Sequence, residues 1–170
     1  LDNQVMVAFG HTAVGVIVGV TAYQFLGQGD LVSGLIIAGT AGVVSHYIAD
    51  FIPHGHYVRG NQVKKYLLPI IIFDVFLPII LLLAVFYLRN GFNEKFFYIV
   101  FGIGGAQLPD VLDGLIYTNK IKVKGLVKIE NNFHQGLHWH GKGSKALLLG
   151  FRDLWQVLLI FIALLLIIYI

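Results

Sequence analysis

The chain has 170 residues, of which 57% are hydrophobic and 12% are charged, and its formal net charge is +3. Soluble domains carry roughly a quarter charged residues, so this composition argues against a soluble fold. No cysteine is present, which excludes disulfides and thiolate ligands. Any bound metal must therefore be held by nitrogen and oxygen atoms.

Five apolar stretches predict an all-α, polytopic membrane protein made of a single domain, 1–170. A helix that crosses a bilayer needs about 20 apolar residues. The stretches cover about 5–26, 31–52, 67–88, 96–116 and 147–170. The first has no basic leading region and includes His11, so we do not expect a cleaved signal peptide. Because the chain begins with Leu1 rather than methionine, we expect a processed or trimmed N-terminus.

The lysine and arginine residues predict the orientation of these spans. Most of the 12 lie in the 53–66 and 117–146 loops, which share a side with the N-terminus. Only Arg89 and Lys95 lie on the other side. The positive-inside rule then places the N-terminus in the cytoplasm and the C-terminus outside, and we expect a prokaryotic cytoplasmic membrane.

Histidine and aspartate residues gather near the cytoplasmic boundary of every span. Ionisable groups beside apolar runs are functional candidates by default, and histidine with carboxylate is what a catalytic divalent metal requires. The simpler interpretation of any single histidine or aspartate is that it is a polar group that joins helices. The full set is His11, His46, Asp50, His54, His56, Asp74, Asp110, Asp113, His134, His138 and His140.

The second span ends with the most specific local pattern. His46 and Asp50 are four residues apart, so on a helix they share one face and can hold one ion. Pro53 then stops the helix, which leaves His54 and His56 free to fold back over the site.

Two further clusters extend the predicted site. Asp110 and Asp113 lie about one turn apart at the end of the fourth span. The third cluster leaves two alternatives open. On a helix His134 and His138 would chelate one ion, whereas in an extended segment His138 and His140 would form a two-histidine clip.

The 117–146 loop alternates in polarity and predicts a small β-hairpin that turns at Gly125, or an interfacial strand. Its lysines supply cytoplasmic flanking charge, or they attract anionic headgroups or a phosphorylated substrate. They are Lys120, Lys122, Lys124 and Lys128.

Three short motifs resemble small polytopic inner-membrane proteins known as membrane-bound metal-dependent hydrolases of the YdjM type. The motifs are Gly10-His11-Thr12-Ala13, Gly105-Ala106-Gln107-Leu108-Pro109-Asp110 and His134-Gln135-Gly136-Leu137-His138. The chain departs from the family pattern by placing its second carboxylate one residue later, at Asp113, and by lacking a His-Arg-Gly-x-x-His spacing. The resemblance implies a metal-dependent hydrolase in the inner membrane.

A second, local resemblance is to zinc-dependent phospholipase C and the related single-strand nucleases. His46-Tyr47-Ile48-Ala49-Asp50 and His56 have the spacing of their signature, with Pro53 one position early. This resemblance implies a multinuclear zinc site that cleaves phosphate esters, with His46, Asp50 and His56 as ligands.

The sequence as a whole predicts a membrane-embedded hydrolase at the cytoplasmic face, with a phosphoester of a lipid or lipid-linked substrate favoured over a carboxylic ester or amide. One or two ions are expected, with zinc favoured and manganese or iron as alternatives. The predicted metal ligands are His11, His46, Asp50, His56, Asp110, Asp113, His134, His138 and His140. His54 is the predicted proton donor and Asp74 the group that orients a ligating histidine. The predicted phosphate-binding residues are Arg59, Lys64, Lys65 and Lys142.

Three alternatives use the same residues. A transporter would bind ions or protons with them, but it should carry polar groups toward the far face. A di-iron membrane oxidase relies on more His-x-x-His-His runs than this chain contains. In the third, a metal only staples the helices together. The sequence predicts a bilayer and a lipid or phosphorylated small molecule as partners, predicts no nucleic acid, and does not indicate an oligomeric state.

Overall fold

The computed structural model describes residues 4–6, 8–51, 56–59, 71–117, 124–137 and 148–169, and nearly all of this part is helical. A short antiparallel ribbon joins β1 (Gln4–Met6) to β2 (His56–Arg59). A π-helical turn, η1 (Ile71–Phe76), leads directly into α4. The α-helices are α1 (Ala8–Leu26), α2 (Leu31–Phe51), α4 (Leu77–Asn90), α5 (Glu94–Tyr117), α6 (Leu126–Leu137) and α7 (Leu148–Tyr169).

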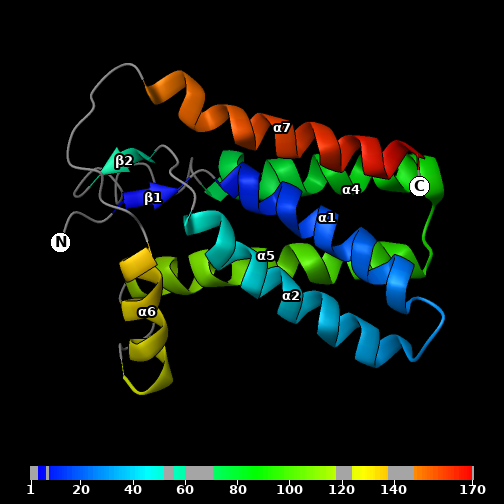
Figure 1. Cartoon of the computed structure of the whole chain (residues 1–170), viewed down its shortest axis with the longest axis horizontal. Helices are drawn as coiled ribbons and strands as arrows, with labels where there is room; N and C mark the ends of the chain where they lie inside the picture. The colour runs from blue at the N-terminus through cyan, green and yellow to red at the C-terminus, as the bar shows by residue number, and fades with distance from the viewer. Residues whose placement is uncertain are drawn as a thin grey trace.

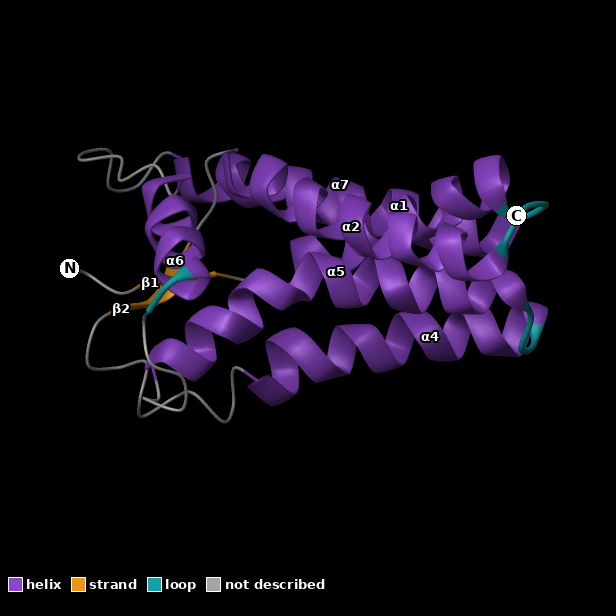
Figure 2. Ribbon diagram, turned by 90° about the horizontal axis from the view of Figure 1, so that it is seen from below, coloured by secondary structure: helices purple, strands orange, loops and turns teal. Residues whose placement is uncertain are grey.

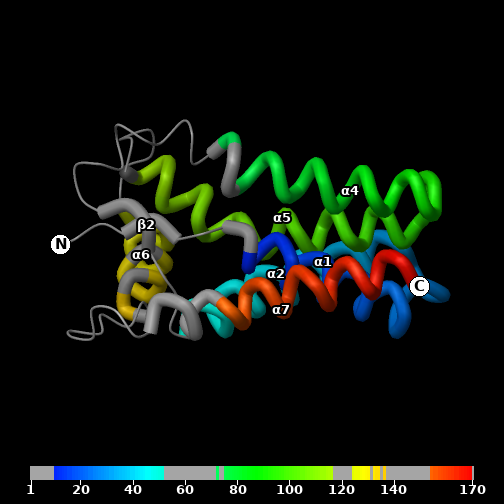
Figure 3. The backbone as a smooth tube through the Cα atoms, turned by 90° about the horizontal axis from the view of Figure 1, so that it is seen from above, coloured from blue at the N-terminus to red at the C-terminus, as the bar shows by residue number. Residues whose placement is uncertain are grey.

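Five of these helices form an elongated bundle and the sixth, α6, lies across one end of it (Figure 1). The other helices run along the long axis, and the same arrangement is seen from below in Figure 2 and from above in Figure 3. We call the end that holds α6, the start of α1 and the ends of α2 and α5 the α6 end. The opposite end, where α7 finishes, is the far end.

Glycines let α5 pack closely against both α1 and α2. A β-carbon on Gly15 of α1 would lie 2.6 Å from the Cα atom of Ile103, and one on Gly42 of α2 would overlap the carbonyl oxygen of Gly102. From α5, β-carbons on Gly102 and Gly105 would overlap the backbones of α1 and α2. Only glycine permits this close approach of three backbones.

An apolar core fills the rest of the bundle between α1, α4, α5 and α7. It consists of Ala13, Val16, Val20, Leu82, Phe86, Ile99, Ile103, Ala163 and Ile167. Large apolar side chains are also abundant on the outside: on α2, Val32, Ile36 and Ile48 are each at least 60% exposed. Two helices, α2 and the Glu94–Ile116 part of α5, are long and apolar enough to cross a membrane, while Gly10–Leu26, Leu77–Asn90 and Leu154–Tyr169 are shorter apolar helices.

The all-α class is confirmed, and each predicted apolar stretch corresponds to a helix, with corrections at the edges. The first stretch was expected to be helical from about residue 5, but β1 extends to Met6 and the helix begins at Ala8. The described part of the third starts with the π-helical turn η1 before α4, because Pro78 has no N–H to donate and favours the first turn of the α-helix that follows.

The predicted hairpin in the 117–146 loop is wrong where the structure describes it. The chain does turn at Gly125, which has a φ of 57°, but it turns into the helix α6. The apolar residues Leu126, Ile129 and Phe133 are three and four apart, which is the helical period, and they form one exposed stripe. The alternating lysines just before this segment obscured that period.

Candidate metal centre

Four helices bring five of the predicted ligands together at the α6 end. Three are buried histidines from different helices, His11 of α1, His46 of α2 and His134 of α6, none of them more than 1% exposed. Asp50, one turn after His46 in α2, is 2% exposed and lies among them. Asp110 joins them from α5 with its side chain 23% exposed, so it is the least buried of the five.

Asp50 is the hub of the group. Its Oδ2 atom lies 2.9 Å from Nε2 of His134 and 3.1 Å from Nε2 of His46, while its Oδ1 atom lies 3.3 Å from Nε2 of His11. Asp110 stands further away, with its carboxylate oxygens 3.9–4.0 Å from the same three nitrogens. All of the histidines therefore present Nε2 to the two carboxylates.

The partners of the Nδ1 atoms determine whether the Nε2 atoms carry a hydrogen or a lone pair. Nδ1 of His46 lies 2.7 Å from the carbonyl oxygen of Ala106, which can only accept, so Nδ1 carries the hydrogen. Nδ1 of His134 faces Asp113 at 3.3 Å and Glu130 at 3.8 Å, which are both acceptors. In the neutral rings both Nε2 atoms then carry lone pairs, although they lie only 3.1 Å apart. A cation shared by the two rings, or a proton on one of them, would resolve this conflict.

The distances between these atoms are those found between ligands of one ion. An ion with metal–nitrogen bonds of about 2.0–2.1 Å holds tetrahedral ligands about 3.3 Å apart. The three shortest separations here, among His46, His134 and Asp50, are 2.9–3.1 Å. The buried histidine and aspartate groups at this end could hold a metal ion.

The electrostatic surroundings of His134 favour a positive charge. Burial opposes the imidazolium form, but hydrogen bonds to the carboxylates of Asp113 and Asp50 outweigh it and raise the pKa of His134 to about 10. The ring of His134 therefore holds a proton when no metal is bound. A metal cation bound at Nε2 would satisfy the same negative field and displace that proton.

The glycine packing of the bundle also positions the site. His11 lies one turn before Gly15, and His46 lies one turn after Gly42, so the close contacts with α5 set the height of both rings. Beside His11, the amide of Gln107 donates a hydrogen bond of 2.6 Å to the hydroxyl of Thr12, which ties α5 to α1.

The structure adds Glu130, which the sequence did not indicate, and Tyr47, which the sequence showed only as part of a motif, to the surroundings of the site. Glu130 accepts a hydrogen bond of 3.0 Å from the hydroxyl of Tyr47 and lies beside Nδ1 of His134. The ring of Tyr47 also packs edge-on against His134 and Phe133. The available signal was the four-residue spacing of Glu130 and His134, which is visible only once the segment is assigned as helix.

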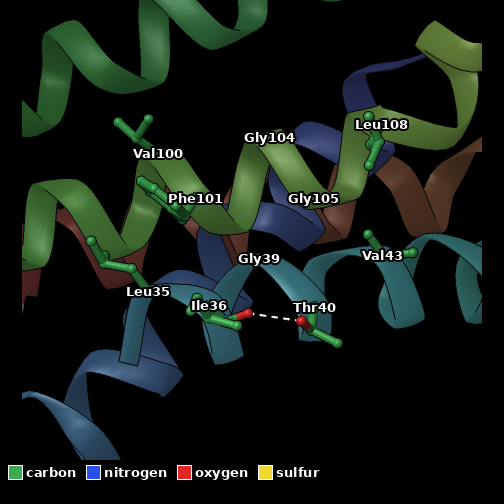
Figure 4. Close-up of a pocket in the computed structure, with 10 residues that line it drawn as sticks. All are labelled: Leu35, Ile36, Gly39, Thr40, Val43, Val100, Phe101, Gly104, Gly105 and Leu108. Carbon is green, nitrogen blue, oxygen red and sulfur yellow. Dashed lines mark hydrogen bonds between the residues drawn. The ribbon is translucent and has the colours of Figure 1, made fainter. Parts of the chain in front are cut away.

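An apolar groove lies between α2 and α5, the two helices that carry Asp50 and Asp110 (Figure 4). Its volume is about 590 Å³, and Gly39, Gly104 and Gly105 form part of its wall. The hydroxyl of Thr40 is turned to the carbonyl oxygen of Ile36 in its own helix, so it presents little polarity to the groove. The remaining lining residues are Leu35, Val43, Val100, Phe101 and Leu108.

For most of the other predicted site residues, the structure does not describe the side chain. His56 and Arg59 belong to β2 and Asp74 to η1, but only their backbone is described. His54, Lys64, Lys65, His138, His140 and Lys142 lie outside the described residues. Asp113, predicted as a ligand, contacts His134 through Nδ1 rather than facing the shared Nε2 atoms.

The chain matched no protein-family model, no curated protein and no solved structure. Its class is therefore defined by the fold and the site alone: a helical protein with a buried histidine and aspartate group that could hold a metal ion.

Proposed function

We propose that this chain is a membrane-embedded, metal-dependent hydrolase that cleaves a phosphoester of a lipid or lipid-linked substrate. The observation that carries the proposal is the convergence of His11, His46 and His134 on the carboxylates of Asp50 and Asp110 at one end of an apolar helix bundle. Zinc is the favoured ion, because nitrogen and carboxylate ligands suit it, with manganese or iron as alternatives.

The outer surface supports the membrane location. A helix that is apolar on all sides belongs in a core or in lipid, and α2 has most of its surface outside the protein core. α6 lies across the bundle at one end and exposes Leu126, Ile129 and Phe133, which suits a helix in the membrane interface. The exposed Lys124 and Lys128 at that end favour the cytoplasmic side.

The side of the site next to Asp110 supports catalysis rather than a structural metal. A catalytic ion keeps an open position for water or substrate, whereas a structural ion is closed. Asp50 lies close to two histidines and is buried, while Asp110 stands back and is partly exposed. When bound there, the metal would lower the pKa of a water and polarise a phosphoryl oxygen. Asp113 and Glu130 hold the ring of His134 in position for this task.

The groove between α2 and α5 supports a lipid as the substrate. On α2 it runs from Leu35 to Val43 and on α5 from Val100 to Leu108, which is about 12 Å of helix. Val43 lies three residues before His46, and Leu108 lies two residues before Asp110, so one end of the groove is within one helical turn of the metal ligands along each helix. A hydrocarbon chain lying in the groove would bring its headgroup to the level of the site.

The lysine and arginine predictions complete the proposal. Arg59, Lys64, Lys65 and Lys142 bind the phosphate, and His54 gives a proton to the leaving group. The transporter alternative gains less support, because the core described between α1, α4, α5 and α7 is an apolar cluster. A di-iron oxidase is separated from a hydrolase by the metal that restores activity and by a requirement for oxygen.

The experiment is a metal and activity assay on protein purified in detergent and in lipid. We expect hydrolysis of a phosphoester, abolished by chelation and restored by zinc or manganese. His46→Ala and Asp110→Asn should lower metal affinity and activity at least ~10–100-fold, the usual loss for a group that merely supports a ligand. The control is Asp30→Asn at the far end, where Asp30 accepts a hydrogen bond of 2.8 Å from the backbone N–H of Ser33 and asparagine caps a helix equally well.

Three outcomes would count against the proposal. Full metal content in His46→Ala and Asp110→Asn would remove the assigned centre. Metal-replete protein that is inert toward phosphoesters, carboxylic esters and amides would exclude the hydrolase and favour the transporter. Loss of metal together with loss of folding would favour a metal that only staples the helices.

A further inference from the structure

We infer that the centre has two ion positions that share both carboxylates, and that His11 supplies the nitrogen ligand of the second position. This inference rests on the metal site of the proposed function but not on hydrolysis. It follows from which carboxylate oxygen each histidine faces.

The ion pairs differ in which carboxylate oxygen each histidine faces. His46 and His134 are paired with Oδ2 of Asp50 and with Oδ1 of Asp110. His11 is paired with the opposite oxygens, Oδ1 of Asp50 at 3.3 Å and Oδ2 of Asp110 at 3.9 Å. Each carboxylate thus turns one oxygen to His46 and His134 and the other to His11, which is how a carboxylate bridges two ions.

The stacking of two imidazole rings supports the same division. The rings of His11 and His46 are 4.0 Å apart between centroids, with 29° between their planes. In enzymes with two metals the ions are about 3.5–4 Å apart. Two nearly parallel rings at this separation can each direct Nε2 to a different ion of such a pair. A single ion does not require them to lie one above the other.

The two positions differ in their chemistry. The first has two imidazole nitrogens and two carboxylate oxygens, which is a complete tetrahedral set for zinc. The second has one nitrogen and two oxygens from the protein, so water or substrate must complete its coordination. We therefore expect the first position to fill at lower metal concentration, and the second to be the one that presents a water.

The competing interpretation is that His11 only donates a hydrogen bond to the carboxylates and orients them around one ion. His11→Gln separates the two, because glutamine keeps an N–H donor and is a poor metal ligand. His11→Ala removes both functions. Neither change replaces a ligand of the first position, although His11 contacts Asp50 and stacks on His46.

The experiment is metal titration of purified protein with manganese, followed by metal analysis and electron paramagnetic resonance. We expect two ions per chain and the signal of a magnetically coupled pair in the wild type. His11→Gln and His11→Ala should each hold one ion and show an isolated manganese signal, with helix content unchanged by circular dichroism.

One ion per chain in the wild type at saturating manganese would overturn the inference, and so would a coupled pair in His11→Gln. The wild-type count decides the question even if a variant fails to fold. A protein that binds two ions but hydrolyses none of the substrates tested would refute the proposed function and leave this inference standing.

Discussion

The two ends of the bundle handle polar side chains in different ways. At the far end they bond to backbone carbonyl oxygens near helix ends: Asn90 donates to Ile167 at 3.4 Å and Tyr98 to Leu26 at 3.4 Å. These bonds satisfy acceptors that a helix end leaves open. At the α6 end, histidine and aspartate side chains from four helices meet one another instead.

The difference indicates which end is functional. Satisfying a helix end stabilises the fold with neutral groups, whereas burying a carboxylate costs several kcal/mol unless a charge partner and hydrogen bonds compensate. Even with a proton on His134, the group formed by the two carboxylates and the three imidazoles keeps a net negative charge. A divalent cation neutralises it, so the α6 end suits metal binding better than it suits a metal-free fold.

The largest effect on stability and bound metal is expected from replacing a glycine that sets the spacing of the helices at the α6 end. In Gly42→Leu the new side chain would overlap the backbone of Gly102. Gly42 lies one turn before His46, so the overlap would displace that ring. Overpacking of a core costs about 1–3 kcal/mol or more. We expect Gly42→Leu to lose both stability in detergent and bound metal, measured by thermal unfolding and metal analysis.

The matched control for that change is Gly104→Ala. A β-carbon there meets nothing within 4 Å, and alanine favours a helix over glycine by about 0.5–1 kcal/mol. Gly104→Ala should therefore be as stable as the wild type or more so, with full metal content. Wild-type metal content in Gly42→Leu would show that close packing of α2 on α5 does not position the site.

The helices could be predicted from the sequence, and so could the placement of the candidate ligands at one end. Both predictions depend on local signals, namely the length of apolar stretches and short helical spacings. His46 with Asp50 is such a spacing, and the structure brings this pair to a common point. The contributions of Glu130 and of the Ala106 carbonyl were not predictable, because both depend on how separate helices meet. A helix at His134 was one of two alternatives left open, but its start at Leu126 was missed because the preceding lysines alternate like a strand.

An intermediate effect is expected from Glu130, which touches the site only through His134 and Tyr47. Glu130→Gln keeps the size of the side chain but weakens its hold on the ring hydrogen at Nδ1 of His134. Groups that orient a metal ligand typically contribute ~10–100-fold to metal affinity or activity. We expect a loss in that range, measured by competition with a chelator.

Glu94→Gln is the control, since Glu94 is an exposed residue of the far end. An equal loss of affinity in Glu94→Gln would trace the effect to net charge rather than to His134. Unchanged affinity in Glu130→Gln would leave Asp113 as the group that orients His134.

The smallest effect is expected from a substitution at the far end. Tyr98 is buried, and its hydroxyl occupies the space that a side chain on Gly34 would fill, while donating a long hydrogen bond of 3.4 Å to Leu26. Tyr98→Phe removes the hydroxyl and keeps the ring. A neutral hydrogen bond contributes about 0.5–1.5 kcal/mol, and the length of this one favours the lower value. We expect a small fall in the unfolding temperature, with metal content, the manganese signal and hydrolysis all unchanged. A loss of metal in Tyr98→Phe would mean that the two ends are coupled through α5, and the division of the bundle into a structural end and a functional end would then be wrong.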